Sequence, residues 1–302
     1  MNSRKDKRVA LTEALDSVTD GSVVAIGGSM FHNKPMALIR ELVRRQPRDL
    51  IVIAVPQASI DVDLLVSAGC VAEVRVPYLG FDHLGLAPGV RAASKSGRLK
   101  IWDCDETQLL AALEAAAKDL PSGLVKAGVG TDLTRTNSDL VAINDPITNE
   151  PMIAVGAIAP DVTLLHASQS DTYGNLRYSG YSFGDSLLAE STKRQGGTVI
   201  ASVEDIVPDL VVQSSPFSTV IAHFLVDAVV ELPFGAHPCS SHGDYAQDEA
   251  ALTAYINAMR NGDEASEEYF SDFIGGVDTH GEYLDAALTP SRMVALLRET
   301  RV

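Results

Sequence analysis

The sequence predicts an α/β fold: an open, mainly parallel sheet with helices on both faces. Near-continuous apolar runs, such as 22–26 and 49–55, alternate with segments whose apolar residues recur at helical spacing. Strands that are apolar on both sides are typical of a parallel sheet covered by helices on each face. We expect a single domain over 1–302, because no repeat, low-complexity tract or flexible linker interrupts the chain.

The expected elements follow one another with short gaps. Pro35 suits the first position of a helix, and Pro121 stops the alanine- and leucine-rich helix before it. From about residue 247 the chain is acidic and mostly helical, with an interruption at Gly275 and Gly276. Strands are expected over 22–26, 49–55, 71–76, 152–155, 162–166, 198–203 and 226–231, and helices over 12–18, 35–45, 60–67, 107–118 and 186–194.

The balance of charged residues excludes some classes of binding partner. The chain has 24 Lys and Arg against 40 Asp and Glu, a net charge of −16, which argues against nucleic acid or an anionic membrane as the main partner. A phosphorylated ligand remains compatible, because anions bind to local amides and cations. A local positive group does follow the first strand, although a solvated helix face is the simpler explanation of these charges. It consists of Lys34, Arg40, Arg44, Arg45 and Arg48.

Cysteine usage and hydropathy indicate a cytoplasmic protein. Cys70, Cys104 and Cys239 are odd in number and widely spaced, so neither a disulfide framework nor a zinc knuckle is predicted. No apolar run approaches the roughly 20 residues of a membrane helix. The polar and basic start of the chain, 1–8, is not followed by an apolar signal core.

A glycine pair, Gly27 and Gly28, ends the first apolar run. It predicts a tight turn at the carboxyl end of a strand, where open α/β folds usually bind ligands. Such a turn can present backbone N–H groups to an anion. We therefore expect Gly27, Gly28 and the nearby Lys34 to contact a ligand.

His166 is a further candidate at the same edge of the sheet. It ends the strand 162–166 and precedes a turn formed by Asp171, Gly174 and Asn175. A strand end followed by a tight turn accounts for these residues without any function, because Gly and Asn tolerate positive φ. A polar contact between His166 and a ligand is the functional alternative.

Acidic and histidine pairs later in the chain favour structural roles. Glu204 and Asp205 are adjacent in a strand and point to opposite faces, so an ion pair or cap is more consistent than a shared proton. His237 and His242, with Asp244, could bind a metal, but no further ligand is suitably spaced, and we predict no metal site.

A serine-hydrolase pattern is present as well. Gly180, Ser182 and Gly184 fit the Gly-x-Ser-x-Gly nucleophile elbow, and Asp209 or Asp227 followed by His237 would complete a triad. No HGGG-type oxyanion segment precedes it, and so short a pattern arises by chance in a chain with 23 glycines. We keep this reading as a minor alternative.

Several of these motifs together resemble the α subunits of family I coenzyme A-transferases, over about 12–248. The glycine turn is similar to acidic-Gly-x-x-three apolar-Gly-Gly-Phe-x-x-x-Gly-x-Pro, with Ser29 in place of Phe and Asn33 in place of Gly. The Asp-x-x-x-x-His-Ala and Asp-x-x-Gly-Asn segments of 161–175 also match the family pattern. So do Val-Glu-x-Ile-Val (203–207) and Gly-Ala-His-Pro (235–238).

The resemblance implies half of an enzyme that moves CoA between an acyl-CoA and a carboxylic acid. In the family a glutamate of the β subunit, in a Ser-Glu-Asn-Gly-like motif, forms a covalent thioester with CoA. This chain lacks that motif, so the resemblance implies inactivity without a β subunit, in an αβ or α2β2 assembly. Coenzyme A would enter as a thioester substrate, with no covalently bound cofactor. Gly27 and Gly28 would offer amides near the developing oxyanion, while Met30, Phe31, His32 and 78–83 are candidates to line the acyl pocket. We expect the loop that carries His237 and His242 to shape the subunit interface or the acyl pocket instead of binding a metal.

Two alternatives stay open. Acidic residues over 103–106 favour capping of the helix 107–118, but the segment is also similar to the α subunit of the ring-opening CoA-ester hydrolases of steroid breakdown. There a glutamate at the position of Glu106 is catalytic, so Glu106 would act as general base in a hydrolase. A non-catalytic sugar-phosphate-binding protein would keep the glycine turn and need no β subunit.

Overall fold

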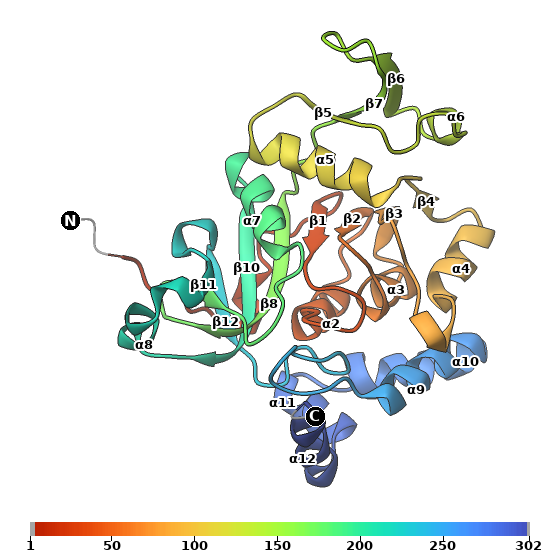
Figure 1. Cartoon of the computed structure of the whole chain (residues 1–302). Helices are drawn as coiled ribbons and strands as arrows, with labels where there is room; N and C mark the ends of the chain where they lie inside the picture. The colour runs from red at the N-terminus through yellow and green to blue at the C-terminus, as the bar shows by residue number, and fades with distance from the viewer. Residues whose placement is uncertain (1–3, 301–302) are drawn as a thin grey trace.

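A nine-stranded sheet forms the centre of the structure, a computed structural model that describes residues 4–300 (Figure 1). Residues 1–3 of the polar N-terminal segment and 301–302 of the tail lie outside the described residues. Neighbouring strands run parallel in the order β12-β10-β8-β1-β2-β3-β4. Their bounds are β1 Val23–Ile26, β2 Leu50–Ala54, β3 Val71–Arg75, β4 Lys100–Ile101, β8 Val162–Ser170, β10 Thr198–Ile206 and β12 Ala228–Glu231.

Two short antiparallel strands extend this sheet beside its carboxyl edge. β10 follows β8 from Val162 to Ser170, whereas β1 pairs only with Val162–Leu164. The far end of β8 is therefore free on the β1 side, and β9 (Leu176–Arg177) pairs there with residues 169 and 170. β11 (Thr219–Ile221) pairs with β9 in turn. The connection from β8 to β9 therefore reverses the chain close to the carboxyl end of β1.

Helices cover both faces, which confirms the predicted fold class. α2 (Met36–Arg45) and α3 (Ile60–Ser67) pack on one face, and α5 (Glu106–Ala117) and α7 (Asp185–Arg194) on the other (Figure 1). Two of the shorter helices are α4 (Pro88–Lys95) and α8 (Asp209–Ser214). The helix expected over 12–18 is shorter than predicted: α1 spans Leu11–Ala14, and the serine and β-branched residues over 17–19 that follow favour a turn.

The strand expected over 152–155 does not belong to the main sheet, which corrects the prediction. It is β7 (Pro151–Gly156), between β5 (Ser122–Val125) and β6 (Leu140–Asn144) in a separate antiparallel sheet. Its side chains alternate between buried and half-exposed, as expected when only one face meets a core. The buried side chains pack with Leu109 and Leu113 of α5, so this small sheet lies beyond α5 in Figure 1.

The C-terminal helices lie near α2, α3 and α4, at the bottom of Figure 1. Tyr255, Ile274 and Leu296 from these helices join the same buried cluster as the inner residues of α2 and α3. Within residues 4–300, no helix combines the length and apolar character that crossing a bilayer requires. The segment contains α9 Glu249–Arg260, α10 Asp263–Phe270, a π-helical turn Ser271–Gly275, α11 His280–Ala287 and α12 Pro290–Glu299.

Candidate active site

The glycine turn lies at the carboxyl end of β1, between β2 and β8 of the sheet. Gly28 has φ +73°, a conformation that glycine adopts without strain. Gly27 is constrained by packing instead: a Cβ at this position would lie 2.6 Å from Oδ1 of Asp185 and 2.7 Å from Cδ2 of Leu165. The backbone conformation therefore requires a glycine at position 28, and the close approach of α7 requires one at position 27.

Asp185, the first residue of α7, is the side chain that approaches the turn. It is fully buried, and its Oδ1 accepts a hydrogen bond of 2.8 Å from the amide of Gly28. Its Oδ2 accepts a second bond, also 2.8 Å, from the hydroxyl of Tyr178. Burial disfavours the ionised carboxylate and raises the pKa of Asp185 to about 6. The sequence prediction did not include this residue.

The backbone amides of the turn all have internal partners. Gly27 donates to the carbonyl of Leu164 at 2.9 Å, and Gly28 donates to Asp185. The next amide, of Ser29, donates to the carbonyl of His32 at 2.9 Å. The amides of Gly27 and Gly28 are therefore not free to bind an anion in this structure.

Lys34 is fully buried behind the turn. Its ammonium lies 2.9 Å from Oδ2 of Asp61, and the side chains of both residues have no exposed surface. It also donates to the carbonyls of Gln57, at 2.9 Å, and of Gly28, at 3.3 Å. Lys34 thus ties the turn to the start of α3 and presents no cation to solvent.

The buried His166 and the partly buried Glu204 form a pair on neighbouring strands. Nε2 of His166 lies 2.8 Å from Oε1 of Glu204, at ion-pair distance although not aligned as a hydrogen bond, and Nδ1 lies 2.9 Å from the hydroxyl of Ser202. Glu204 also accepts hydrogen bonds from the amides of Phe234 and Gly235, at 2.6 and 3.2 Å. The ion-pair role expected for Glu204 is present, and it fixes the Gly-Ala-His-Pro loop against the sheet.

An aromatic group stands beside the turn, formed by His32, Tyr181, Phe183 and His242; we call it the aromatic quartet. The rings of His32 and Phe183 stack at 6.1 Å between centroids, and those of Tyr181 and His242 lie 5.1 Å apart. Burial and the nearby His242 lower the pKa of His32. Of the residues suggested for an acyl pocket, His32 joins this group, whereas Phe31 is buried against Phe81.

Asn33 holds the aromatic quartet together. Its Nδ2 donates to the carbonyl of Tyr181 at 2.7 Å, and its Oδ1 accepts from the amide of His242 at 2.7 Å. Its φ of +53° is tolerated by Asn better than by most residues. The positive φ explains why a glycine suits this position in the family pattern.

Glu106 is the first residue of α5 and is exposed. The helix begins just after β4, and Leu109 packs with Ala25 and Val55, so the start of α5 lies at the same carboxyl edge as the glycine turn. Asp105 caps the helix through the amide of Thr107 at 2.8 Å, in a capping box with Gln108. Capping therefore accounts for Asp105 and leaves the Glu106 carboxylate available.

The remaining candidate motifs have structural explanations. Ser182 follows β9, an antiparallel strand of two residues, rather than the parallel strand that a nucleophile elbow requires. His237 is buried, with Nδ1 2.8 Å from the hydroxyl of Tyr283 and Nε2 3.3 Å from Asp248. Among residues 4–300, no group of three His, Cys, Asp or Glu side chains is arranged to hold a metal.

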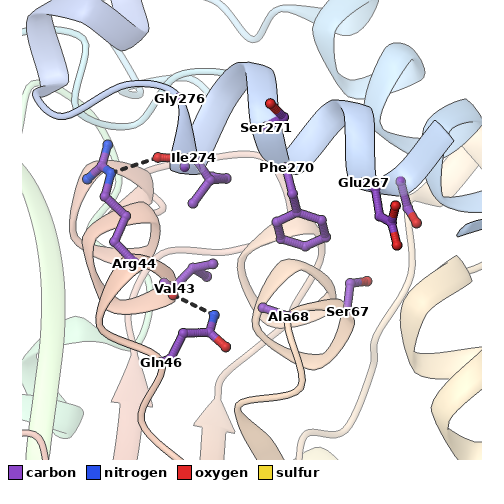
Figure 2. Close-up of a pocket in the computed structure, with 12 residues that line it drawn as sticks. Val43, Arg44, Gln46, Ser67, Ala68, Glu267, Phe270, Ser271, Ile274 and Gly276 are labelled. Carbon is purple, nitrogen blue, oxygen red and sulfur yellow. Dashed lines mark hydrogen bonds between the residues drawn. The ribbon is translucent and has the colours of Figure 1, made fainter. Parts of the chain in front are cut away.

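A cavity of about 800 Å³ lies away from this edge (Figure 2). It is bordered by the last turns of α2 and α3 and by the π-helical turn, so it faces the amino edge of the sheet. Arg44 enters it but donates to the carbonyls of Ile274 and Val277, both at 3.0 Å (Figure 2 draws the first). The guanidinium of Arg44 thus joins α2 to the C-terminal helices and presents no free cation to the cavity.

Both the sequence and the fold match known proteins. A family model described as coenzyme A transferase matches residues 8–232. An uncharacterized protein of Archaeoglobus fulgidus is 34% identical over 97% of this chain, which spans 65% of that protein's length. A cholesterol ring-cleaving hydrolase IpdA subunit of Rhodococcus jostii is 32% identical, over 91% of this chain and 94% of the relative. The crystal structure of glutaconate coenzyme A-transferase from Acidaminococcus fermentans matches with a TM-score of 0.90 at 27% identity, over 96% of this chain and 95% of that one.

Proposed function

The chain belongs to the coenzyme A transferase family, and from that premise we propose that it is the α-type subunit of an enzyme that moves CoA between an acyl-CoA and a carboxylic acid. In this proposal the acyl-CoA binds at the carboxyl edge of the main sheet. Coenzyme A enters as the thioester of one acid and leaves as the thioester of the other, with no covalently bound cofactor. A β-type partner, in an αβ or α2β2 assembly, supplies the other wall of the site.

The proposal rests on the partners of the carboxylates around the turn, which leave none of these carboxylates free to attack a thioester. Asp185 accepts hydrogen bonds from Gly28 and Tyr178, Glu204 pairs with His166, and Asp61 pairs with Lys34. A nucleophilic carboxylate needs a free oxygen that faces the thioester. These three are engaged inside the chain, so in the transferase proposal we assign the nucleophilic glutamate to the partner; Glu106, exposed at the same edge, is the carboxylate used by the second candidate function below.

In this proposal, the residues of this chain form one side of the substrate site and hold it in shape. Gly27 lets the turn pack closely against Asp185 and Leu165, and Gly28 lets it pack against the backbone of His32 and Asn33; both glycines thus fix the turn at the edge where the thioester binds. Lys34 and His166 support the turn and the 234–238 loop from behind through Asp61 and Glu204. An oxyanion contact by the amide of Gly28 would require its bond to Asp185 to open.

The experiment is to purify this chain alone and together with a β-type protein, sought among the products of the neighbouring genes. CoA transfer from acetyl-CoA to a panel of carboxylic acids is then measured for each preparation. We expect activity from the complex only, and a Ser-Glu-Asn-Gly-like motif in the partner. Transfer by this chain alone would contradict the proposal, and so would an active complex whose partner tolerates replacement of that glutamate.

A CoA-ester hydrolase is the second candidate, favoured by the position of Glu106. Its carboxylate is exposed at the carboxyl edge, where it can act as a general base toward water or a substrate C–H. The similarity to a ring-cleaving hydrolase subunit supports this reading. If the partner lacks the glutamate motif, Glu106→Gln should abolish turnover, while Glu114→Gln on the same helix serves as control. Retained turnover in Glu106→Gln would remove the hydrolase candidate.

A further inference from the structure

The aromatic quartet is not used by the function proposed above, although it adjoins the glycine turn. The carbonyl of His32 accepts a hydrogen bond of 2.9 Å from the amide of Ser29, which directly follows Gly28. A ligand group seated on the quartet would therefore lie next to the thioester. In an acyl-CoA this group is the acyl chain, because the long pantetheine arm holds the nucleotide away from the thioester.

We propose that the aromatic quartet binds the acyl group of the substrate, and that this acyl group carries an apolar ring. The inference rests on the proposed function, since it assumes that a CoA thioester occupies the carboxyl edge. It assigns an acyl-recognition role to four side chains from three separate segments: His32, Tyr181, Phe183 and His242.

Exposure supports a binding surface rather than a packed core. Tyr181 is 69% exposed and Phe183 is 37% exposed, although both rings belong to an ordered aromatic group. Exposed aromatic side chains gathered in one place are typical of binding sites, where their faces contact apolar groups of a ligand. An apolar ring stacked on Tyr181 or Phe183 would bury surface that now faces solvent.

The quartet is also built before any ligand arrives. Asn33 bonds to the backbone of both Tyr181 and His242, at 2.7 Å each, and His32 lies 2.6 Å from the hydroxyl of Ser240. Phe183 has φ +48°, a costly conformation for a bulky side chain that persists only where neighbours fix it. Side chains held in this way lose little entropy when they bind a ligand.

Charge around the quartet disfavours an acyl group that ends in a second carboxylate. Asp244, two residues after His242, accepts hydrogen bonds of 2.6 Å from Ser179 and Ser241. This carboxylate would repel an acidic acyl end. The cation nearest the turn in sequence, Lys34, is committed to Asp61 and has no exposed surface.

The experiment uses the complex with its partner and three substrates: acetyl-CoA, glutaryl-CoA and 2-naphthoyl-CoA. Tyr181→Ala is the test variant, because its ring is mostly exposed and its removal leaves no buried cavity. Phe224→Ala, 68% exposed and distant from the quartet in sequence, is the matched control, and Tyr181→Phe is the conservative variant. We expect Tyr181→Ala to raise KM for 2-naphthoyl-CoA about fivefold to tenfold. KM for acetyl-CoA should change less than about twofold, and Tyr181→Phe and Phe224→Ala should behave like the unmodified complex.

An equal change in KM for all three thioesters would overturn the inference, and so would preferred use of glutaryl-CoA by the unmodified complex. Weakened assembly of the Tyr181→Ala complex in sedimentation would also overturn it, because the quartet would then contact the partner. If the complex transfers CoA from none of them, the proposed function fails. In that case the acyl site is tested by the binding of 2-naphthoic acid, which is measured through the fluorescence of the naphthoate. Weaker binding to Tyr181→Ala than to the unmodified complex supports the acyl site, and unchanged binding contradicts it.

Discussion

The carboxylate of Asp185 accepts a hydrogen bond from the amide of Gly28 at 2.8 Å, joining residues 157 positions apart in the chain. The same Oδ1 would lie 2.6 Å from a Cβ at Gly27. The glycine pair is thus shaped by a buried carboxyl group on the neighbouring crossover helix. Replacing either partner should therefore alter both the stability and the active edge of the protein.

Gly27→Ala should place a methyl group against Asp185 and Leu165. We expect the free energy of unfolding to fall by about 1–3 kcal/mol, as is usual when atoms are added to a packed site. Urea denaturation measures this change. Gly156→Ala is the control, since nothing lies within 4 Å of the added Cβ there, and it should change stability little. Equal effects from both variants would show that close packing of α7 is not what requires Gly27.

Asp185→Asn should change how stability depends on pH. The folded pKa of about 6 lies above the usual aspartate pKa of 3.8, so the folded chain holds the proton more tightly than the unfolded chain. This contribution is fully present below about pH 4 and is lost as pH rises through about 6. Unfolding free energies at pH 4 and pH 7 should therefore differ less in Asp185→Asn than in the unmodified protein, by roughly 2–3 kcal/mol. Identical pH profiles would rule out a raised pKa at this site.

Lys34→Met should be severely destabilising, because it leaves the carboxylate of Asp61 buried without a cation. We expect a loss of about 3–5 kcal/mol, and substantial recovery in the double variant Lys34→Met/Asp61→Leu. Lys118→Met, which breaks the exposed pair with Glu114, should cost under about 1 kcal/mol. A double variant as unstable as the single one would mean that Lys34 acts through contacts other than the ion pair.

Asn33→Gly should loosen the aromatic quartet while keeping the positive φ. It removes the bonds to Tyr181 and His242, at about 1 kcal/mol each. Hydrogen exchange of the His242 amide should accelerate in this variant. Asn33→Asp keeps the acceptor for that amide and should preserve its protection. Unchanged exchange in Asn33→Gly would show that the loop is held by other contacts.

The parallel sheet was predictable because β1, β2, β8 and β10 are apolar on both faces and are flanked by helical segments. The antiparallel additions were not predictable, since β9 has two residues and β5 has a single buried position. Their pairing depends on contacts distant in sequence. The three-stranded sheet was missed for the same reason.

Within the site, local sequence indicated the turn but not its environment. Lys34 follows a glycine turn and precedes a helix with several arginines, which is also the pattern of a surface cation; its burial depends on Asp61. Asp185 was missed because its neighbours matched a serine-hydrolase pattern. An acidic residue directly after a glycine, at the start of an expected helix, was the available signal; its burial depends on contacts distant in sequence.

In the function proposed above, this chain supplies one wall of a thioester site and its partner supplies the nucleophile. Mass spectrometry of peptides from the complex, after incubation with acetyl-CoA, is the decisive test of this division of labour. We expect a CoA adduct on a glutamate of the partner and none on residues of this chain, Glu106 included. A CoA adduct on this chain, or CoA transfer by this chain in the absence of any partner, would contradict it.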